Sequence, residues 1–103
     1  MNSLLVAYSP TAIEELLEIE RYLESKDFGA TKRFRDEFDT EIDSLLLFPK
    51  SAPVIYKPNI RKRLMQRFQY KIFFAVENDY LVVLHVIHPR QLEDLDELFG
   101  GAN

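Results

Sequence analysis

The stretch IRKRLMQRFQYKIFFAVENDYLVVLHVIHPR, residues 60–90, decides the fold. Two strands are expected in its second half, over residues 70–76 and 80–88, because both segments are rich in β-branched and aromatic residues. Glu77-Asn78-Asp79 between them is typical of a hairpin turn. Residues 60–76 contain no Gly, Pro, Asn or Asp. One unusually long strand and two strands with a cryptic turn at residues 66–69 therefore both remain open.

Upstream of this stretch, residues 4–8 (LLVAY) predict a short buried strand, and Ser9-Pro10 suits the start of a helix. Two amphipathic helices are expected, one starting at about residue 10 and one from about residue 30 to 48, ended by prolines. The apolar positions of the first are Ala12, Ile13, Leu16, Leu17, Ile19 and Leu23. Those of the second are Phe34, Phe38, Ile42, Leu45 and Leu46.

Downstream, residues 91–99 (QLEDLDELF) carry Leu92, Leu95 and Phe99 at helical spacing, and Gly100-Gly101 makes a natural stop. This pattern predicts a short C-terminal helix. The order of elements indicates an α+β fold in one domain, residues 1–103. In it, an N-terminal strand and an antiparallel helical hairpin pack on a small, mostly antiparallel sheet.

Composition excludes several classes of function. The chain has no Cys and only three Gly, so thiolate metal sites and a glycine-rich phosphate loop are excluded. Two His without a carboxylate motif give no metal signature. Neither a signal peptide nor an apolar run of about 20 residues is present. We therefore expect a cytoplasmic protein with no cofactor, no metal and no membrane contact.

Charge is strongly segregated along the chain, although the net charge is only −4. Residues 1–43 balance to −6, residues 44–76 to +7 with no acid at all, and residues 77–103 to −5. Such a one-sided middle segment can create a local positive field. Alternatively, its cations pair with the acidic flanking segments on the folded surface.

The ordered combination of VAYSPTAIEELLEIERYLES, a second helix ending in LLLFP, and residues 60–90 resembles the ParE/RelE superfamily of toxins. The resemblance covers residues 3–90 and implies a chain turn near residues 66–69. These toxins belong to bacterial type II toxin–antitoxin, or plasmid stabilisation, modules. The resemblance implies a growth-inhibiting toxin that a cognate antitoxin neutralises, as a homodimer or as a toxin–antitoxin hetero-oligomer.

The resemblance leaves the target open. ParE-like members act on DNA gyrase without known catalysis, whereas RelE-like members cut mRNA on the ribosome without a metal. A third alternative is a detoxified relative that only binds its antitoxin. After Arg90 the chain has no tyrosine, which RelE-like nucleases tend to keep near the C-terminus, and its tail is acidic. These departures favour the ParE-like branch.

Candidate site residues come from the basic strand and the H-x-R ending. Under the RelE-like reading, His88, Arg61 and Arg90 are the expected catalytic residues, with His88 as a proton carrier and the arginines stabilising the phosphorane. The residues expected to bind the target or the antitoxin are Arg61, Arg63, Arg67, Lys71 and Arg90. Strand alternation puts Arg61 and Arg63 on one face, and we expect Lys71 to join them across the sheet. His85 is expected to be a packed structural histidine on the face of Val83.

Overall fold

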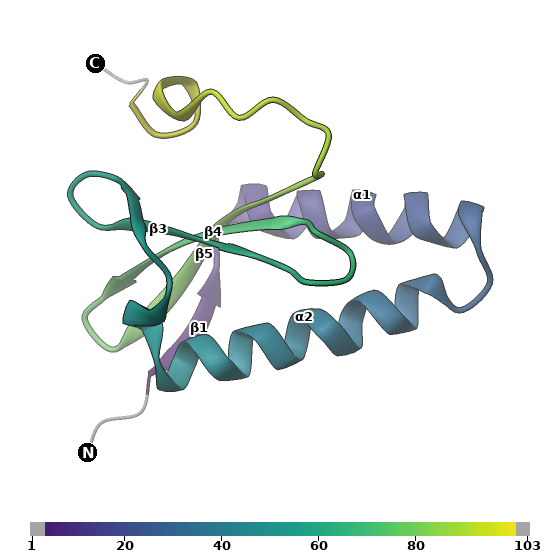
Figure 1. Cartoon of the computed structure of the whole chain (residues 1–103), viewed down its shortest axis with the longest axis horizontal. Coiled ribbons are helices and arrows are strands. Elements are labelled where there is room, and N and C mark those ends of the chain that lie inside the picture. Colours follow the sequence, from purple (N-terminus) through teal and green to yellow (C-terminus); the bar gives the residue numbers. More distant parts are fainter. Residues whose placement is uncertain (1–3, 101–103) are drawn as a thin grey trace.

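The computed structural model describes residues 4–100, and within them a sheet and a helical hairpin form two layers (Figure 1). The strands are β1 (Leu5–Tyr8), β2 (Val54–Tyr56), β3 (Ile60–Leu64), β4 (Lys71–Glu77) and β5 (Tyr80–Ile87). The helices are α1 (Pro10–Lys26), α2 (Ala30–Leu47), the short 3-10 turn η1 (Pro49–Ser51) and the π-helical turn η2 (Asp96–Gly100). The predicted α+β class is confirmed.

The strands form one sheet in the order β1-β5-β4-β3-β2, in which β1 runs parallel to β5 and every other pair is antiparallel. The basic stretch consists of two strands with a turn between them. The Met65 N–H donates to the Tyr70 carbonyl at 2.9 Å, and Gln69 adopts a left-handed φ of 62°. Gln adopts this conformation less readily than Asn or Gly, so the sequence carries no signal for the turn. The edge strand β2 was not predicted.

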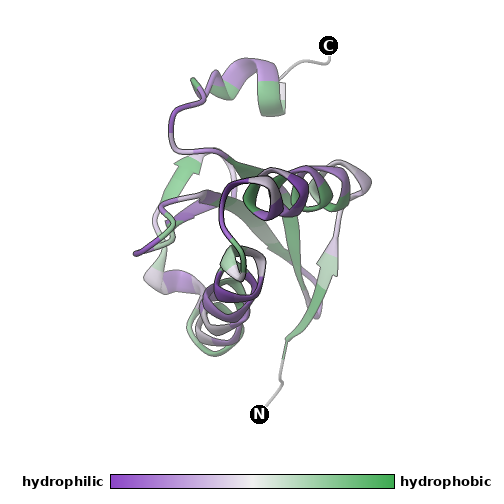
Figure 2. Cartoon of the chain, turned by 90° about the vertical axis from the view of Figure 1, so that its right-hand side faces the viewer, coloured by the Kyte–Doolittle hydropathy of each residue, from purple (hydrophilic) through white to green (hydrophobic). Residues whose placement is uncertain are grey.

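The two helices cover one face of the sheet through apolar side chains. Ser9 caps α1 by accepting the Ala12 N–H at 3.0 Å, as expected. On α2, Phe34 is fully buried and packs its ring against Phe38 and Phe68. Both helices alternate hydrophilic and hydrophobic residues, whereas the central strands are mainly hydrophobic (Figure 2). The burial therefore follows the helical spacing of the sequence.

The apolar stripe of α1 is narrower than predicted. Ile19 and Leu23 are buried in the core, as expected, but Ile13 and Leu17 remain about half exposed. No helix within residues 4–100 is long and apolar enough to cross a membrane.

A β-bulge in β5 changes the faces of its last residues. Phe73 pairs with His85 but the next residue of β4, Phe74, pairs with Val83. The extra residue, Leu84, has no partner on β4, so His85 does not share the face of Val83 and that expectation is wrong. Beside the bulge, the Leu84 backbone is instead hydrogen-bonded by the residue that caps α1. The Ser9 hydroxyl donates to the Leu84 carbonyl at 2.9 Å.

The C-terminal segment forms a short helical turn, as predicted, and its Phe99 packs on the sheet. The Phe99 ring lies 5.6 Å from the Phe73 ring and 5.4 Å from the His85 ring. Leu92 is 93% exposed, so its predicted packing is wrong. The reason is that regular helix is confined to η2, and residues 92–94 are irregular. The segment lies on the side of the sheet away from α2 (Figure 1).

Candidate functional site

Strand β3 divides the predicted binding residues between the two faces of the sheet. Arg61 pairs with Phe74 and Arg63 with Ile72, and both partners are buried beneath the helices. The alternate residues Lys62 and Leu64 pair with Phe73 and Lys71 on the opposite face. Because directly paired residues point to the same side, Lys71 does not join the arginines across the sheet, and that expectation is wrong.

On the helix side, the two arginines of β3 are held by the chain itself. The Arg63 guanidinium donates to Glu41 of α2 at 2.7 Å and to the Ser51 hydroxyl at 2.7 Å. The Glu41 side chain is only 11% exposed, so this ion pair is shielded from solvent. Arg61 donates to the Ala52 carbonyl. Both guanidinium groups therefore stabilise the junction between α2, η1 and β3.

On the outer face, one carboxylate holds both lysines. Glu93 lies 3.0 Å from the Lys62 ammonium and 3.0 Å from the Lys71 ammonium. Burial alone would raise the pKa of the Glu93 carboxyl, but hydrogen bonds from Lys71 and Lys62 outweigh it and hold the pKa below its usual value. The acidic C-terminal segment thus neutralises two cations of the basic strand pair.

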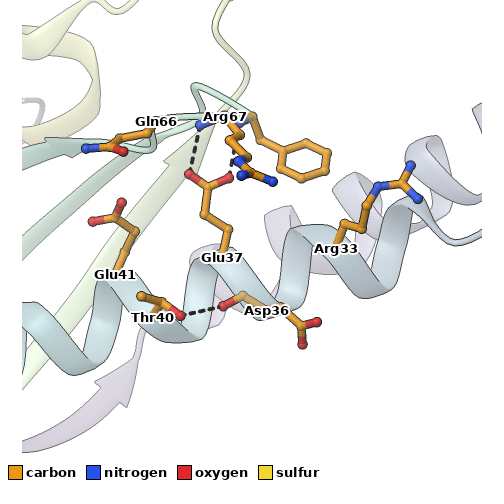
Figure 3. A pocket seen from close by; sticks show the side chains of 8 residues that line it. Arg33, Asp36, Glu37, Thr40, Glu41, Gln66 and Arg67 are labelled. Carbon is orange, nitrogen blue, oxygen red and sulfur yellow. Dashed lines mark hydrogen bonds between the residues drawn. The ribbon is translucent and has the colours of Figure 1, made fainter.

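A cleft of about 640 Å³ lies between α2 and the β3–β4 turn (Figure 3). Glu37 of α2 accepts the backbone N–H groups of Arg67 at 2.9 Å and Phe68 at 3.2 Å, and so fixes the turn on the helix. The other two acids of the cleft are also paired, Asp36 with Lys32 and Glu41 with Arg63. Each of its carboxylates therefore has a partner within the chain.

Arg67 differs from the other predicted binding residues of the sheet. Within residues 4–100 its guanidinium forms no hydrogen bond or ion pair with another side chain or carbonyl, although its backbone N–H is held by Glu37. Arg33, also at the cleft, pairs with Asp27 in the loop before α2. Both arginine side chains stand on the side of α2 that faces the turn (Figure 3). Asp36 and Glu41 are thus paired with cations and Glu37 is hydrogen-bonded to the turn, whereas the Arg67 guanidinium is the charged group of the cleft without a partner among residues 4–100.

The end of β5 places His88 next to Arg90 and two tyrosines. The Arg90 N–H donates to His88 Nδ1 at 3.0 Å. The His88 ring lies edge-on to Tyr70 at 5.3 Å and to Tyr22 at 6.0 Å. Neither tyrosine was expected here. The only tyrosine considered from the sequence was one after Arg90, where the chain has none. Beyond residue type, the sequence gives no sign of this cluster. Tyr22 lies on α1 and Tyr70 directly before β4, and only the fold brings the two together.

The third residue of the predicted catalytic set, Arg61, lies far from His88. Arg61 pairs with Phe74, whereas extending the register of Ile87 and Lys71 by one residue puts His88 opposite Tyr70. Two strand spacings across and four residues along the strands separate the two Cα atoms by roughly 16 Å. The Arg61 guanidinium is moreover held at Ala52. Among residues 4–100, no group of three His, Cys, Asp or Glu side chains gathers in a way that could hold a metal ion.

Comparison with known proteins adds three findings. A family model described as the ParE toxin of the type II toxin–antitoxin system parDE matches residues 6–93. A solved structure described as the chromosomal ParDE TA system from P. aeruginosa superimposes with a TM-score of 0.68 and 14% sequence identity, covering 84% of this chain and 96% of that chain. At this identity the structural match supports the fold alone. A search of curated proteins found no match.

Proposed function

This chain belongs to the ParE toxin family of type II toxin–antitoxin systems, and from this premise we propose that it inhibits bacterial growth by acting on DNA gyrase in the cytoplasm. A cognate antitoxin holds it silent. The observation that carries the proposal is the family match over residues 6–93, a range that contains both helices and strands β2 to β5 in full. The choice of gyrase follows the ParE branch of the superfamily.

The geometry supports a binding protein more than a nuclease. Metal-free RNA cleavage needs a base, an acid and cations around one phosphate. Arg61 lies roughly 16 Å from His88 by strand spacing and is held by a backbone carbonyl. Its guanidinium would have to break the hydrogen bond to that carbonyl and move along the sheet from β3 to the end of β5 to act with His88. Such a set would need rearrangement before it could stabilise a phosphorane.

The antitoxin contact proposed here is the cleft between α2 and the β3–β4 turn. A partner segment with carboxylates would meet the guanidinium of Arg67 there. Asp36 and Glu41 are already paired with Lys32 and Arg63, and Glu37 is hydrogen-bonded to backbone N–H groups of the turn. Guanidinium–carboxylate pairs are strong, directional hydrogen bonds. Arg67 and Arg90 keep the binding role expected from the sequence. Arg61, Arg63 and Lys71 serve mainly the fold.

The gyrase proposal is tested with the purified chain and purified gyrase on relaxed plasmid. We expect saturating chain to block supercoiling or to accumulate cleaved DNA, and addition of the cognate antitoxin to restore supercoiling. Supercoiling that proceeds unchanged at saturating chain contradicts the proposal.

Two further assays separate the alternatives if gyrase is unaffected. Codon-phased cuts in mRNA in a translating extract, lost in His88→Ala, would identify a RelE-like ribosome-dependent endoribonuclease. Uncut message together with harmless expression in cells lacking the antitoxin would identify a detoxified relative that only binds antitoxin.

A further inference from the structure

A second cleft, of about 170 Å³, lies on the helix side between α1 and the ends of β4 and β5. Its polar and aromatic lining consists of Glu15, Glu18, Tyr22, Tyr70, His88 and Gln91. Pockets for drug-sized ligands occupy roughly 300–1,000 Å³. This cleft is therefore of a size for one long side chain rather than for a cofactor or a helix.

The cleft contains a buried side chain whose polar end has no partner among residues 4–100. Tyr70 is only 3% exposed, with its ring packed edge-on against Phe34 at 5.3 Å and His88 at 5.3 Å. Within residues 4–100 its hydroxyl forms no hydrogen bond with the protein, yet no side-chain polar atom there is both fully buried and unpaired. The hydroxyl therefore opens into the cleft that Tyr70 lines. Burial, and secondarily the charge of Tyr22, raises the pKa of Tyr70, so it remains a neutral O–H at physiological pH.

Two further rings give the cleft flat aromatic surfaces. His88 stands nearly perpendicular to Tyr22 (87°) and to Tyr70 (81°). Because His88 Nδ1 accepts the Arg90 N–H, Nε2 is the ring nitrogen left for other contacts. Tyr22 is about half exposed, and the Lys26 ammonium already lies 5.3 Å above its ring. The Tyr22 ring therefore already attracts one cation. The aromatic rings of the cleft offer an incoming cation a further contact of this kind.

The charged side chains that line this cleft are acidic, although the Lys26 ammonium lies near its Tyr22 ring. Its two ionisable carboxylates, Glu15 and Glu18, come from one face of α1, and no Lys or Arg is among its lining residues. Glu15 is used by the chain, since its oxygens contact the Val86 N–H at 2.8 Å and His85 Nδ1 at 3.0 Å. The Glu18 carboxylate, by contrast, forms no hydrogen bond or ion pair with any group in residues 4–100. The complementary occupant is a cation with several N–H donors and a flat face.

We propose that this cleft receives the guanidinium of an arginine side chain from a partner protein. The planar group lies against the aromatic rings, donates to Glu18 and the Tyr70 hydroxyl oxygen, and leaves its backbone outside the opening. A lysine ammonium has no flat face and uses the rings less well. Free arginine is a poorer occupant, because its α-ammonium and α-carboxylate lose more hydration at the opening than the neutral peptide groups of a chain arginine do. This inference does not depend on the toxin function.

The test uses a capped amino acid as the probe. N-acetyl-arginine amide is titrated into the ¹⁵N-labelled chain, and amide chemical shifts are followed by NMR. We expect saturable shifts at Ile19, Tyr22 and Tyr70. The uncharged isostere N-acetyl-citrulline amide and free arginine should each bind at least about threefold more weakly. Equal affinity for the citrulline probe or for free arginine, or the lack of shifts at these amides, overturns the proposal.

Two variants locate the binding within the cleft. Glu18→Gln removes the unpaired carboxylate and should weaken the capped arginine about threefold to tenfold. Tyr70→Phe removes only the hydroxyl and should weaken it about twofold to fivefold. Glu14→Gln is the matched control, because Glu14 is a carboxylate of α1 that does not line this cleft, although it shares a neighbouring depression with Glu15 and Glu18. Equal losses in Glu14→Gln and Glu18→Gln would indicate general charge attraction and overturn the proposal.

Discussion

The two faces of the sheet treat the cations of β3 in different ways. On the helix side, Arg63 is paired with Glu41 in a shielded contact beside a continuous aromatic core. On the outer face, Lys62 and Lys71 share Glu93, which comes from a C-terminal segment with little regular structure. The helix side is thus fixed by side chains buried between two layers, whereas the outer face is covered by a few contacts from one short segment.

The difference shows that a run of positive charge in the sequence is not one surface in the fold. Alternation along β3 sends successive cations to opposite faces, and each face supplies its own acid. The charge pattern left two interpretations of residues 44–76 open, a local positive field and pairing with the acidic flanking segments. Each of them describes a part of this basic segment. Lys62, Arg63 and Lys71 pair with carboxylates of the flanking segments and Arg61 with a backbone carbonyl, whereas the Arg67 guanidinium at the turn has no such partner among residues 4–100.

The largest expected contrast between the faces is in aromatic packing. Phe34→Ala should lower the free energy of unfolding by about 3–5 kcal/mol, because Phe34 is buried among Phe38, Phe68 and Tyr70. Phe99→Ala, on the outer face, should lower it by only about 1–2 kcal/mol, since the ring is partly exposed. Urea unfolding of both variants measures the two losses. Equal losses would mean that the C-terminal segment is as integral to the core as α2.

The aromatic core is also the part of the fold that the sequence predicted best. Phe34 and Phe38 were assigned to the core by helical spacing alone, and the β4–β5 hairpin by residue type and the turn at Asn78. These signals are local and repeat over many residues. The β3–β4 turn carried no such signal, because its left-handed residue is Gln69. The bulge at Leu84 likewise depends on contacts with Ser9, far away in sequence.

A smaller contrast is expected between two acids of α2. Glu41→Ala should cost about 1–3 kcal/mol of unfolding free energy, because it leaves the shielded Arg63 with only the Ser51 hydroxyl. Asp36→Ala removes the exposed pair with Lys32 and should cost less than about 0.5 kcal/mol. Thermal or urea unfolding of both variants checks this ranking. A Glu41 variant as stable as the Asp36 variant would show that the Arg63 contact is not structural.

The smallest effect concerns the outer face and depends on pH. At pH 7, Glu93→Gln should cost about 0.5–1 kcal/mol, because it weakens the contacts with Lys62 and Lys71. The pKa of Glu93 is lowered in the fold. Its contribution is therefore fully present above the ordinary carboxyl pKa of about 4.3 and is lost as the pH falls through the lower folded-state pKa. Urea unfolding at pH 7 and pH 3 measures the difference between the variant and the parent chain. A difference that persists unchanged at pH 3 would contradict this assignment.

The candidate site was less predictable than the fold. The sequence identified Arg67 and His88 as functional candidates by residue type, but it could not reveal that Glu37 fixes the turn or that Glu93 occupies the lysines. The Glu37–Arg67 and Lys62–Glu93 contacts join residues about 30 positions apart in the chain, and the Lys71–Glu93 contact joins residues about 20 apart. Such pairings depend on how the elements dock. No spacing rule within one helix or strand encodes them.

The central claim is that the cations on strands β3 and β4 bind groups within the chain, whereas the proposed role of Arg67 is to bind the antitoxin. The most direct test is calorimetric titration of the cognate antitoxin into the Arg67→Gln and Lys71→Gln variants, after urea unfolding has shown that both are folded. We predict that Arg67→Gln weakens binding by at least about tenfold, the loss of a charged hydrogen bond, and that Lys71→Gln changes it by less than about twofold. Equal losses, or a larger loss in Lys71→Gln, would contradict the account.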